Sequence, residues 1–174
     1  MQAPDMENKV VIVTGSARGI GRAIAERFAT EGSSVVLADL DNNGIERVAE
    51  KISADGGSAF PIATDVAVEE QVDALFDTTL NQYGTVDVLV NNAGLISPVK
   101  HVLEVDKAWW DRLIGANLTG TFLCARRAAH IMARNRKGSI LTMSSGGATK
   151  AHRAFVAYDA SKGCLLYTSP SPRD

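Results

Sequence analysis

The sequence predicts an α/β fold, a doubly wound parallel sheet with helices on both of its faces. Short runs of apolar, mostly β-branched residues, such as Val10–Val13, alternate with longer amphipathic stretches. Glycines at 32, 56 and 84 each follow an amphipathic stretch, where the end of a helix is expected. The alternation indicates repeated strand–helix units within one domain.

The expected elements follow in chain order. The apolar runs predict strands at 9–14, 34–39, 58–63, 86–91 and 138–144. The amphipathic stretches predict helices at 20–31, 43–55, 68–83 and 105–135, the last one broken near Gly115.

Composition excludes several classes of function. The chain has 174 residues, a net charge of −2 and 45% hydrophobic residues, so it has no basic footprint for nucleic acid or an anionic membrane. The apolar runs are far too short to span a membrane, and residues 1–8 lack the pattern of a secretory signal, so we expect a cytoplasmic protein. Two cysteines do not form a disulfide framework, and the three scattered histidines predict no metal site.

A glycine-rich loop joins the first expected strand to the first expected helix. Gly15, Gly19 and Gly21 lack a Cβ, so the backbone can approach a pyrophosphate at the N-terminus of that helix. Ser16, Arg18 and Ile20 belong to the same candidate cofactor loop. The alternative is a glycine turn that serves only tight packing between strand and helix.

Asp39 ends the second expected strand, where a carboxylate can accept hydrogen bonds from the adenosine ribose. Its charge would repel a 2′-phosphate, so NAD is favoured and NADP remains possible. Arg18 is the opposing observation, because a guanidinium in this loop can hold that phosphate, although a solvated surface arginine is an equal alternative.

A candidate acid/base group lies near the end of the chain. Tyr158 and Lys162 are four residues apart, so on a helix the ammonium lies on the same face as the phenol, where its charge favours a phenolate. Ser145 comes thirteen residues before Tyr158, in the loop after the last expected strand.

Together these motifs resemble the short-chain dehydrogenase/reductase family over residues 8–163. The resemblance is carried by the glycine loop, Asp65-Val66, the Asn91-Asn-Ala-Gly94 segment, Asn117 and the Ser145/Tyr158/Lys162 set. It implies a Rossmann fold with strand order 3-2-1-4-5. It also implies hydride transfer between NAD(P) and a secondary alcohol or ketone, in a homo-oligomer of two or four chains.

The resemblance also assigns the catalytic set. Tyr158 would be the general acid in ketone reduction and the general base in alcohol oxidation. Lys162 would support the phenolate and bind the nicotinamide ribose, and Ser145 would hydrogen-bond the substrate oxygen. Asn117 would hold a water that links Lys162 to solvent, although it could instead only cap or kink the long helix after Gly115.

Further cofactor contacts follow from the same resemblance. Asp65 would contact the adenine amino group and Val66 would pack beside the ring. An N-cap for the 68–83 helix is an alternative or additional role for Asp65. Asn91 would brace the central strands, while Ala93 and Gly94 would leave room for ribose.

The end of the chain departs from the family pattern. Residues 164–174 read as the translation of a transposase-type sequencing adapter, so we expect a single domain over 1–163, followed by a non-native tail. A polar native tail is the alternative. The family sheet has seven strands, so we expect the last strands to be missing, the fifth strand to be an exposed edge, and this chain to have low solubility and little activity.

Two other functions remain open. The first is an NADPH-dependent 3-oxoacyl-[acyl-carrier-protein] reductase, which cofactor preference would distinguish. The second is a non-catalytic dinucleotide-binding protein, against which the intact Ser145/Tyr158/Lys162 set argues. The small-molecule substrate does not follow from these residues, because the loops beyond the strands determine it.

Overall fold

A computed structural model describes residues 6–96, 99–150 and 152–168. In that part of the chain, five parallel strands form one sheet in the order β3-β2-β1-β4-β5. The strands are β1 Val10–Thr14, β2 Ser34–Asp39, β3 Ser58–Ala63, β4 Val88–Asn91 and β5 Ser139–Thr142. The predicted fold class and strand order are therefore confirmed, with β4 and β5 shorter than expected.

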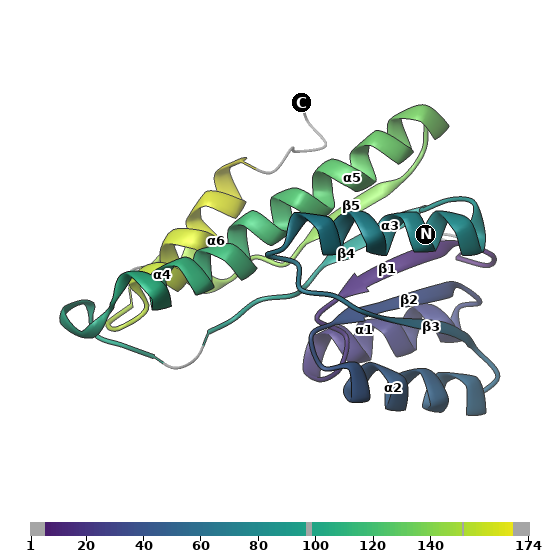
Figure 1. Ribbon diagram of the computed structural model, residues 1–174, viewed down its shortest axis with the longest axis horizontal. Coiled ribbons are helices and arrows are strands. Elements are labelled where there is room, and N and C mark those ends of the chain that lie inside the picture. The colour runs from purple at the N-terminus through teal and green to yellow at the C-terminus, as the bar shows by residue number, and fades with distance from the viewer. Residues whose placement is uncertain (1–5, 97–98, 151, 169–174) are drawn as a thin grey trace.

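Helices cover both faces of the sheet (Figure 1). Two of them, α1 Gly19–Thr30 and α2 Asn42–Ala54, pack on one face. The other face is covered by α3 Glu69–Tyr83 and α5 Gly120–Asn135. Two further helices, α4 Lys107–Ile114 and α6 Val156–Thr168, pack together beyond the carboxyl ends of the strands (Figure 1).

The core is divided by the sheet into two layers. All five residues of β1 are buried, and their side chains alternate between the layers: Ile12 packs under α3 and α5, whereas Val11 and Val13 pack under α1 and α2. Burial on both faces explains why the strand reads as a continuous apolar run.

The predicted ends of the first three helices are confirmed. Gly84, for example, ends α3 with φ of +75°, a left-handed conformation in which a Cβ is unfavourable.

The long helix predicted over 105–135 is not broken in the expected way. Asp106 caps α4 by accepting a hydrogen bond from the Trp109 N–H, so the helix begins later than predicted. Gly115 keeps right-handed helical angles, and residues 115–119 form a π-helical turn that leads directly into α5. The α-helical pattern is thus interrupted where the sequence predicted, but by a π-helical turn that keeps the chain helical and not by a break in the rod.

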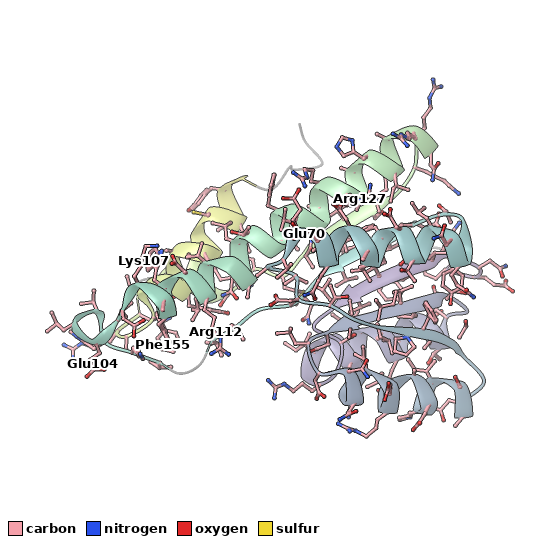
Figure 2. The ribbon with its side chains drawn as sticks, in the orientation of Figure 1. Glu70, Glu104, Lys107, Arg112, Arg127 and Phe155 are labelled. Carbon is pink, nitrogen blue, oxygen red and sulfur yellow. The ribbon has the colours of Figure 1, made fainter. Side chains whose placement is uncertain are left out.

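Ion pairs join the two helices of one layer. Arg127 of α5 pairs with Asp73, at 3.0 Å, and with Asp77 of α3, while Arg126 pairs with Glu69. Figure 2 labels Arg127 between α5 and α3, in agreement with these ion pairs.

The fifth strand is the outermost strand among the described residues. Ile140 and Leu141 are 39% and 47% exposed, as expected for an edge. Residues 164–168 continue α6, whereas 169–174 of the expected tail lie outside the described residues. Within the described ranges, no helix combines the length and hydropathy that a membrane span requires, and no cluster of acidic, His and Cys side chains could hold a metal.

Candidate active site

The residues singled out from the sequence lie at the carboxyl ends of the strands. Gly15 follows β1, Asp39 ends β2, Asn91 ends β4, and Ser145 comes shortly after β5. Because all five strands are parallel, these ends share one edge of the sheet. A cavity of about 280 Å³ between α1 and α2 is lined by Gly32 and Gly57. Because both residues precede strands, this cavity lies at the opposite edge of the sheet from the candidate site.

The glycine loop is attached to β2 on its inner side and open on its outer side. Gly15 donates its N–H to the Ala38 carbonyl at 2.7 Å, and the fully buried Ser16 donates its hydroxyl to the same oxygen at 3.4 Å. Gly19 has φ of +57° with nothing within 4 Å of the position that a Cβ would take, and Arg18 and Ile20 are exposed. Ser16 therefore supports the loop, whereas residues 18–20 present a free surface.

The first turn of α1 has no capping side chain. Arg18 occupies the N-cap without a side-chain hydrogen bond to the helix, whereas Asp41 caps α2 by accepting from the Gly44 N–H at 2.9 Å. The uncapped N–H groups give the start of α1 the character of an anion site.

Asn92, which the sequence analysis did not single out, connects the glycine loop to β4. Its side-chain amide donates to the carbonyls of Thr14 and Gly15 at 2.9 and 3.0 Å, and the Thr14 hydroxyl accepts from the N–H groups of Asn92 and Ala93. A Cβ on Gly21 would lie 2.5 Å from the Asn92 amide nitrogen and 2.1 Å from the Gly15 carbonyl oxygen. Gly21 is therefore required for close packing of the loop.

The Asp39 carboxylate lies against the same loop. One oxygen accepts from the Ala17 N–H at 3.0 Å and the other from the Asp41 N–H at 3.1 Å. These two bonds fix the carboxylate at the end of β2, beside the loop, while each oxygen retains further acceptor capacity.

Asp65 and Val66 follow β3. Asp65 accepts a hydrogen bond from the Ala67 N–H at 2.9 Å and does not cap α3, whose N-cap is Val68, so the N-cap alternative is wrong. Val66 is buried and packs against Gly120, where a Cβ would lie 2.6 Å from its methyl group. Asp65 thus holds a turn at the exposed end of the strand.

Two asparagines brace the region around β4. Asn91 is buried, and its amide donates to the Thr121 carbonyl of α5 at 3.5 Å. Asn117, fully buried in the π-helical turn, accepts from the Leu95 N–H at 2.6 Å and donates to the Leu95 carbonyl at 2.9 Å. Gly94 faces Asn117, and a Cβ on Gly94 would lie 3.2 Å from the side-chain Oδ1 of Asn117.

Asn117 also connects to the tyrosine through a serine that the sequence analysis passed over. Its amide donates to the Ser161 hydroxyl at 3.2 Å, and that hydroxyl donates to the Tyr158 carbonyl at 2.7 Å. Ser161 is fully buried, so this polar chain fixes the first turns of α6 on the π-helical turn.

Tyr158 and Lys162 lie on one face of α6. The Lys162 ammonium is 5.8 Å from the centre of the phenol ring and donates to the Met143 carbonyl at 2.7 Å. Lys162 is only 6% exposed, and burial lowers the pKa of its ammonium. The positive charge is thus held near the phenol by a backbone carbonyl.

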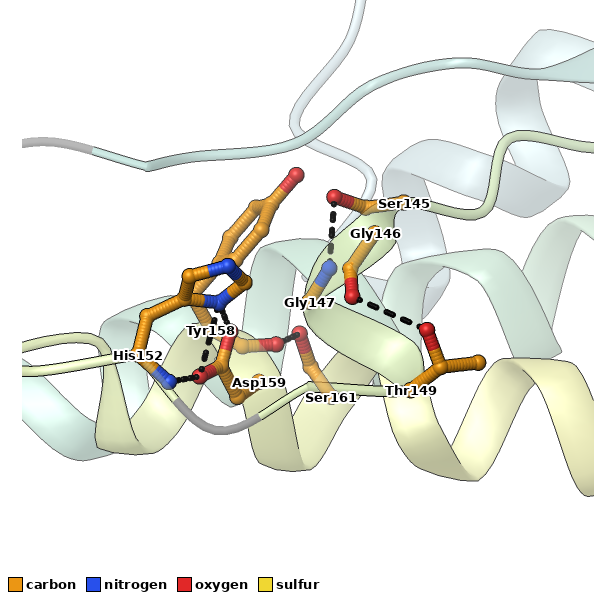
Figure 3. A network of polar contacts seen from close by, with 8 residues as sticks. All are labelled: Ser145, Gly146, Gly147, Thr149, His152, Tyr158, Asp159 and Ser161. Carbon is orange, nitrogen blue, oxygen red and sulfur yellow. Dashed lines mark hydrogen bonds and ion pairs between the residues drawn. The ribbon is translucent and has the colours of Figure 1, made fainter.

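Ser145 lies across from the tyrosine. Figure 3 shows the hydroxyl groups of Ser145 and Tyr158 on the same side of the network. The Ser145 hydroxyl accepts from the Gly147 N–H at 3.2 Å, and a Cβ on Gly147 would be 3.3 Å from two carbons of the Tyr158 ring. Ser145, Tyr158 and Lys162, three of the four expected catalytic side chains, therefore come from one contiguous part of the structure, and Asn117 is linked to it through Ser161.

The sequence of this chain matches one protein family over most of its length. The family model described as short chain dehydrogenase matches residues 9–169. Glucose 1-dehydrogenase 2 of Bacillus subtilis (strain 168) is 42% identical over 163 residues, which cover 91% of this chain and 62% of that protein. Tropinone reductase-like 2 of Erythroxylum coca is 43% identical over 173 residues, covering 96% and 62%.

A third relative is described as an uncharacterized oxidoreductase of Thermotoga maritima, 41% identical over 162 residues, with 92% of this chain and 62% of that protein covered. The chain thus spans about three fifths of the length of these relatives. Because the family model covers nearly the whole chain and the Rossmann sheet is present, this protein belongs to the short-chain dehydrogenase/reductase family.

Proposed function

We propose that the protein is an NAD(P)-dependent oxidoreductase that interconverts a secondary alcohol and a ketone, with Tyr158 as the proton donor and acceptor. The observation that carries the proposal is the position of the Lys162 ammonium, 5.8 Å from the Tyr158 ring and fixed by the Met143 carbonyl. A fixed positive charge beside the ring would stabilise the negative charge that develops on the phenol oxygen during proton transfer.

The residues at the strand ends fit a dinucleotide. The uncapped start of α1 and the open surface at Gly19 suit a pyrophosphate, and the Asp39 carboxylate beside them suits ribose hydroxyls. The dinucleotide supplies or accepts the hydride. NAD is the favoured cofactor because Asp39 would repel a 2′-phosphate, while the exposed Arg18 keeps NADP as the alternative.

The side chains divide the work around the substrate. Ser145 donates a hydrogen bond to the substrate oxygen, on which negative charge develops during reduction. Tyr158 gives that oxygen its proton, or removes it in the reverse direction. Lys162 favours the resulting phenolate, and the chain from Asn117 through Ser161 holds Tyr158 in place.

Binding of the dinucleotide is tested first, by titrating the chain with NADH and NADPH and following cofactor fluorescence. We expect tighter binding of NADH, and a reversed preference in Asp39→Ala, because the repulsive carboxylate is removed. Failure of both cofactors to bind would refute the proposal, and tighter NADPH binding by the parent would favour the 3-oxoacyl reductase alternative.

The chemistry is tested with Tyr158→Phe. A panel of secondary alcohols and ketones that includes glucose and tropinone is suggested by the names of the relatives. We expect turnover to fall about a thousandfold, with NADH affinity nearly unchanged, because only the acid/base hydroxyl is lost. Unchanged turnover would refute the role of Tyr158, and turnover of any substrate in the panel by the parent chain would argue against the non-catalytic alternative.

A further inference from the structure

Asp159, the residue after Tyr158, is directed back toward the segment between β5 and α6 (Figure 3). Its Oδ2 accepts a hydrogen bond of 2.8 Å from the His152 backbone N–H, and the His152 Nδ1 lies 3.3 Å from both carboxylate oxygens. The Asp159 side chain is 15% exposed, although the His152 side chain is 47% exposed. The hydrogen bond from the His152 backbone N–H to the Asp159 carboxylate is therefore the stronger of the two contacts. It is charge-assisted and largely shielded from solvent, whereas the imidazole is exposed.

The other carboxylate oxygen faces the start of the same segment. A Cβ on Gly147 would lie 2.4 Å from Asp159 Oδ1, so the Gly147 backbone packs directly against the carboxylate as well as against the Tyr158 ring. The Gly147 N–H in turn donates to Ser145. The Asp159 carboxylate thus touches two separate points of the segment that carries Ser145.

Aromatic contacts complete the enclosure of the tyrosine. Phe155 makes edge-to-face contacts with His152, at 6.0 Å between ring centres, and with Tyr158, at 6.1 Å. Gly147 and Phe155 therefore flank Tyr158, His152 flanks Phe155, and both Gly147 and His152 contact Asp159.

We propose that Asp159 is a positioning residue, whose carboxylate holds Gly147 beside the Tyr158 ring and His152 beside Phe155, and so fixes the Ser145 hydroxyl relative to the phenol. The inference rests on the proposed function for the roles of Ser145 and Tyr158, but the contacts that it concerns can be tested without turnover. The backbone bond predicts a graded series, in which Asp159→Ala removes the acceptor, Asp159→Asn keeps a weaker one, and His152→Ala keeps the N–H and loses only the ring.

The first test follows Tyr158 directly by ¹⁹F NMR of the full chain labelled with 3-fluorotyrosine. The chain has three tyrosines, and Tyr158→Phe identifies the signal of Tyr158. We expect this signal to move or split in Asp159→Ala, to move less in Asp159→Asn, and to move least in His152→Ala. Tyr83, which packs on Phe60 at 6.5 Å, is the internal control and should keep its signal.

The second test measures cleavage by trypsin after Arg153, an exposed residue next to His152. Release of the backbone bond should make cleavage in Asp159→Ala about tenfold faster than in the parent, because the segment opens more often. In His152→Ala the rate should change by less than about threefold, since the backbone bond remains.

The inference is overturned if the Tyr158 signal and the Arg153 cleavage rate are the same in Asp159→Ala and in the parent. If Asp159→Ala also loses the Tyr83 signal, Asp159→Asn decides: a displaced Tyr158 signal with Tyr83 intact supports the inference, and an unmoved one overturns it. The NADH titration is separate, so a chain that does not bind NADH refutes the proposed function while the positioning by Asp159 is judged on the ¹⁹F series alone.

Discussion

The sheet from β3 to β4 and the region of β5 and α6 are stabilised in different ways. Every residue of β4 is buried between helical layers, whereas its neighbour β5 has three exposed residues out of four. The glycine loop lies on the buried part of the sheet, where backbone groups and the side chains of Ser16, Asp39 and Asn92 hold it. The tyrosine region lies beside the exposed fifth strand and is fixed by a series of polar side chains, Asn117, Ser161 and Asp159.

This difference separates the two halves of the candidate site. The proposed dinucleotide-binding half depends on the closely packed core, so its geometry should be resistant to surface changes. The proposed catalytic half depends on individual hydrogen bonds, each of which one substitution can remove. Matched residues from buried and exposed parts of the molecule allow this difference to be measured.

The largest contrast is expected between the two cysteine thiols. Burial raises the pKa of Cys124 in α5 to about 12, whereas Cys164 in α6 is exposed. At pH 8 a disulfide reagent should therefore modify Cys164 at least about a thousandfold faster, because the thiolate is the reactive form. Unfolding in guanidinium should equalise the rates, and Cys164→Ser should abolish the fast phase. Two equal fast phases in the folded protein would contradict the burial of the Cys124 thiol.

The next contrast is between two residues paired across β4 and β5. Leu89 is fully buried, and its partner in the register, Ile140, is 39% exposed. Leu89→Ala should lower the free energy of unfolding by about 3 kcal/mol because it leaves a cavity. Ile140→Ala should cost about 1 kcal/mol or less. Urea unfolding measures both, and equal losses would show that β5 is as well covered as β4.

A smaller contrast concerns two glycines. Gly21→Ala places a methyl group against the Gly15 carbonyl and the Asn92 amide and should cost about 2 kcal/mol of stability. Gly146→Ala has nothing within 4 Å of the new methyl group and should change stability by less than about 0.5 kcal/mol. Thermal unfolding of the two variants provides the comparison, and a tolerated Gly21→Ala would contradict the close packing of the loop.

The smallest effect is a pH dependence of opposite sign at two lysines. Burial lowers the pKa of Lys162, so the unfolded chain binds more protons between the folded-state pKa and about 10.5, and stability rises with pH in that window. The hydrogen bond and charge of Asp55 raise the pKa of Lys51, so its contribution is present below about 10.5 and is lost as pH rises through the folded-state pKa.

Lys162→Met and Lys51→Met test these signs when unfolding is measured from about pH 8 to about pH 11, on either side of the ordinary lysine pKa. The free energy of unfolding of the parent minus that of the variant should rise with pH for Lys162→Met and fall with pH for Lys51→Met. The same slope for both would contradict the assigned environments.

The sequence was sufficient for the features that are local. β-branched runs predicted the strands because strands buried on both faces have no polar side, and the spacing of Tyr158 and Lys162 placed them on one helical face. Asn92 and Ser161 could not be found in this way. Their roles depend on polar groups that other segments bring near them. Asn92 bonds to the end of β1, and Ser161 bonds to Asn117 of the π-helical turn.

The sequence predicted the position of the irregularity near Asn117 but not its form, a π-helical turn. Glycine at 115 suggested a break, because glycine is unfavourable inside helices, but the surrounding packing of Leu95 and Ser161 on Asn117 keeps the chain helical. The contact between Asp159 and His152 was equally hidden, since nothing in the spacing of these residues requires the intervening segment to fold back.

The π-helical turn also restricts how the length of this chain can vary. A π turn accommodates one residue more than an α turn, so α4 and α5 continue as one rod in Figure 1 while their side-chain rows are offset by about 100°. Losing one residue between 115 and 119 would leave a regular rod but rotate Trp109 and Leu113 away from Ala157. The distance in sequence from α4 to α5 is therefore as constrained as the identity of the residues within it.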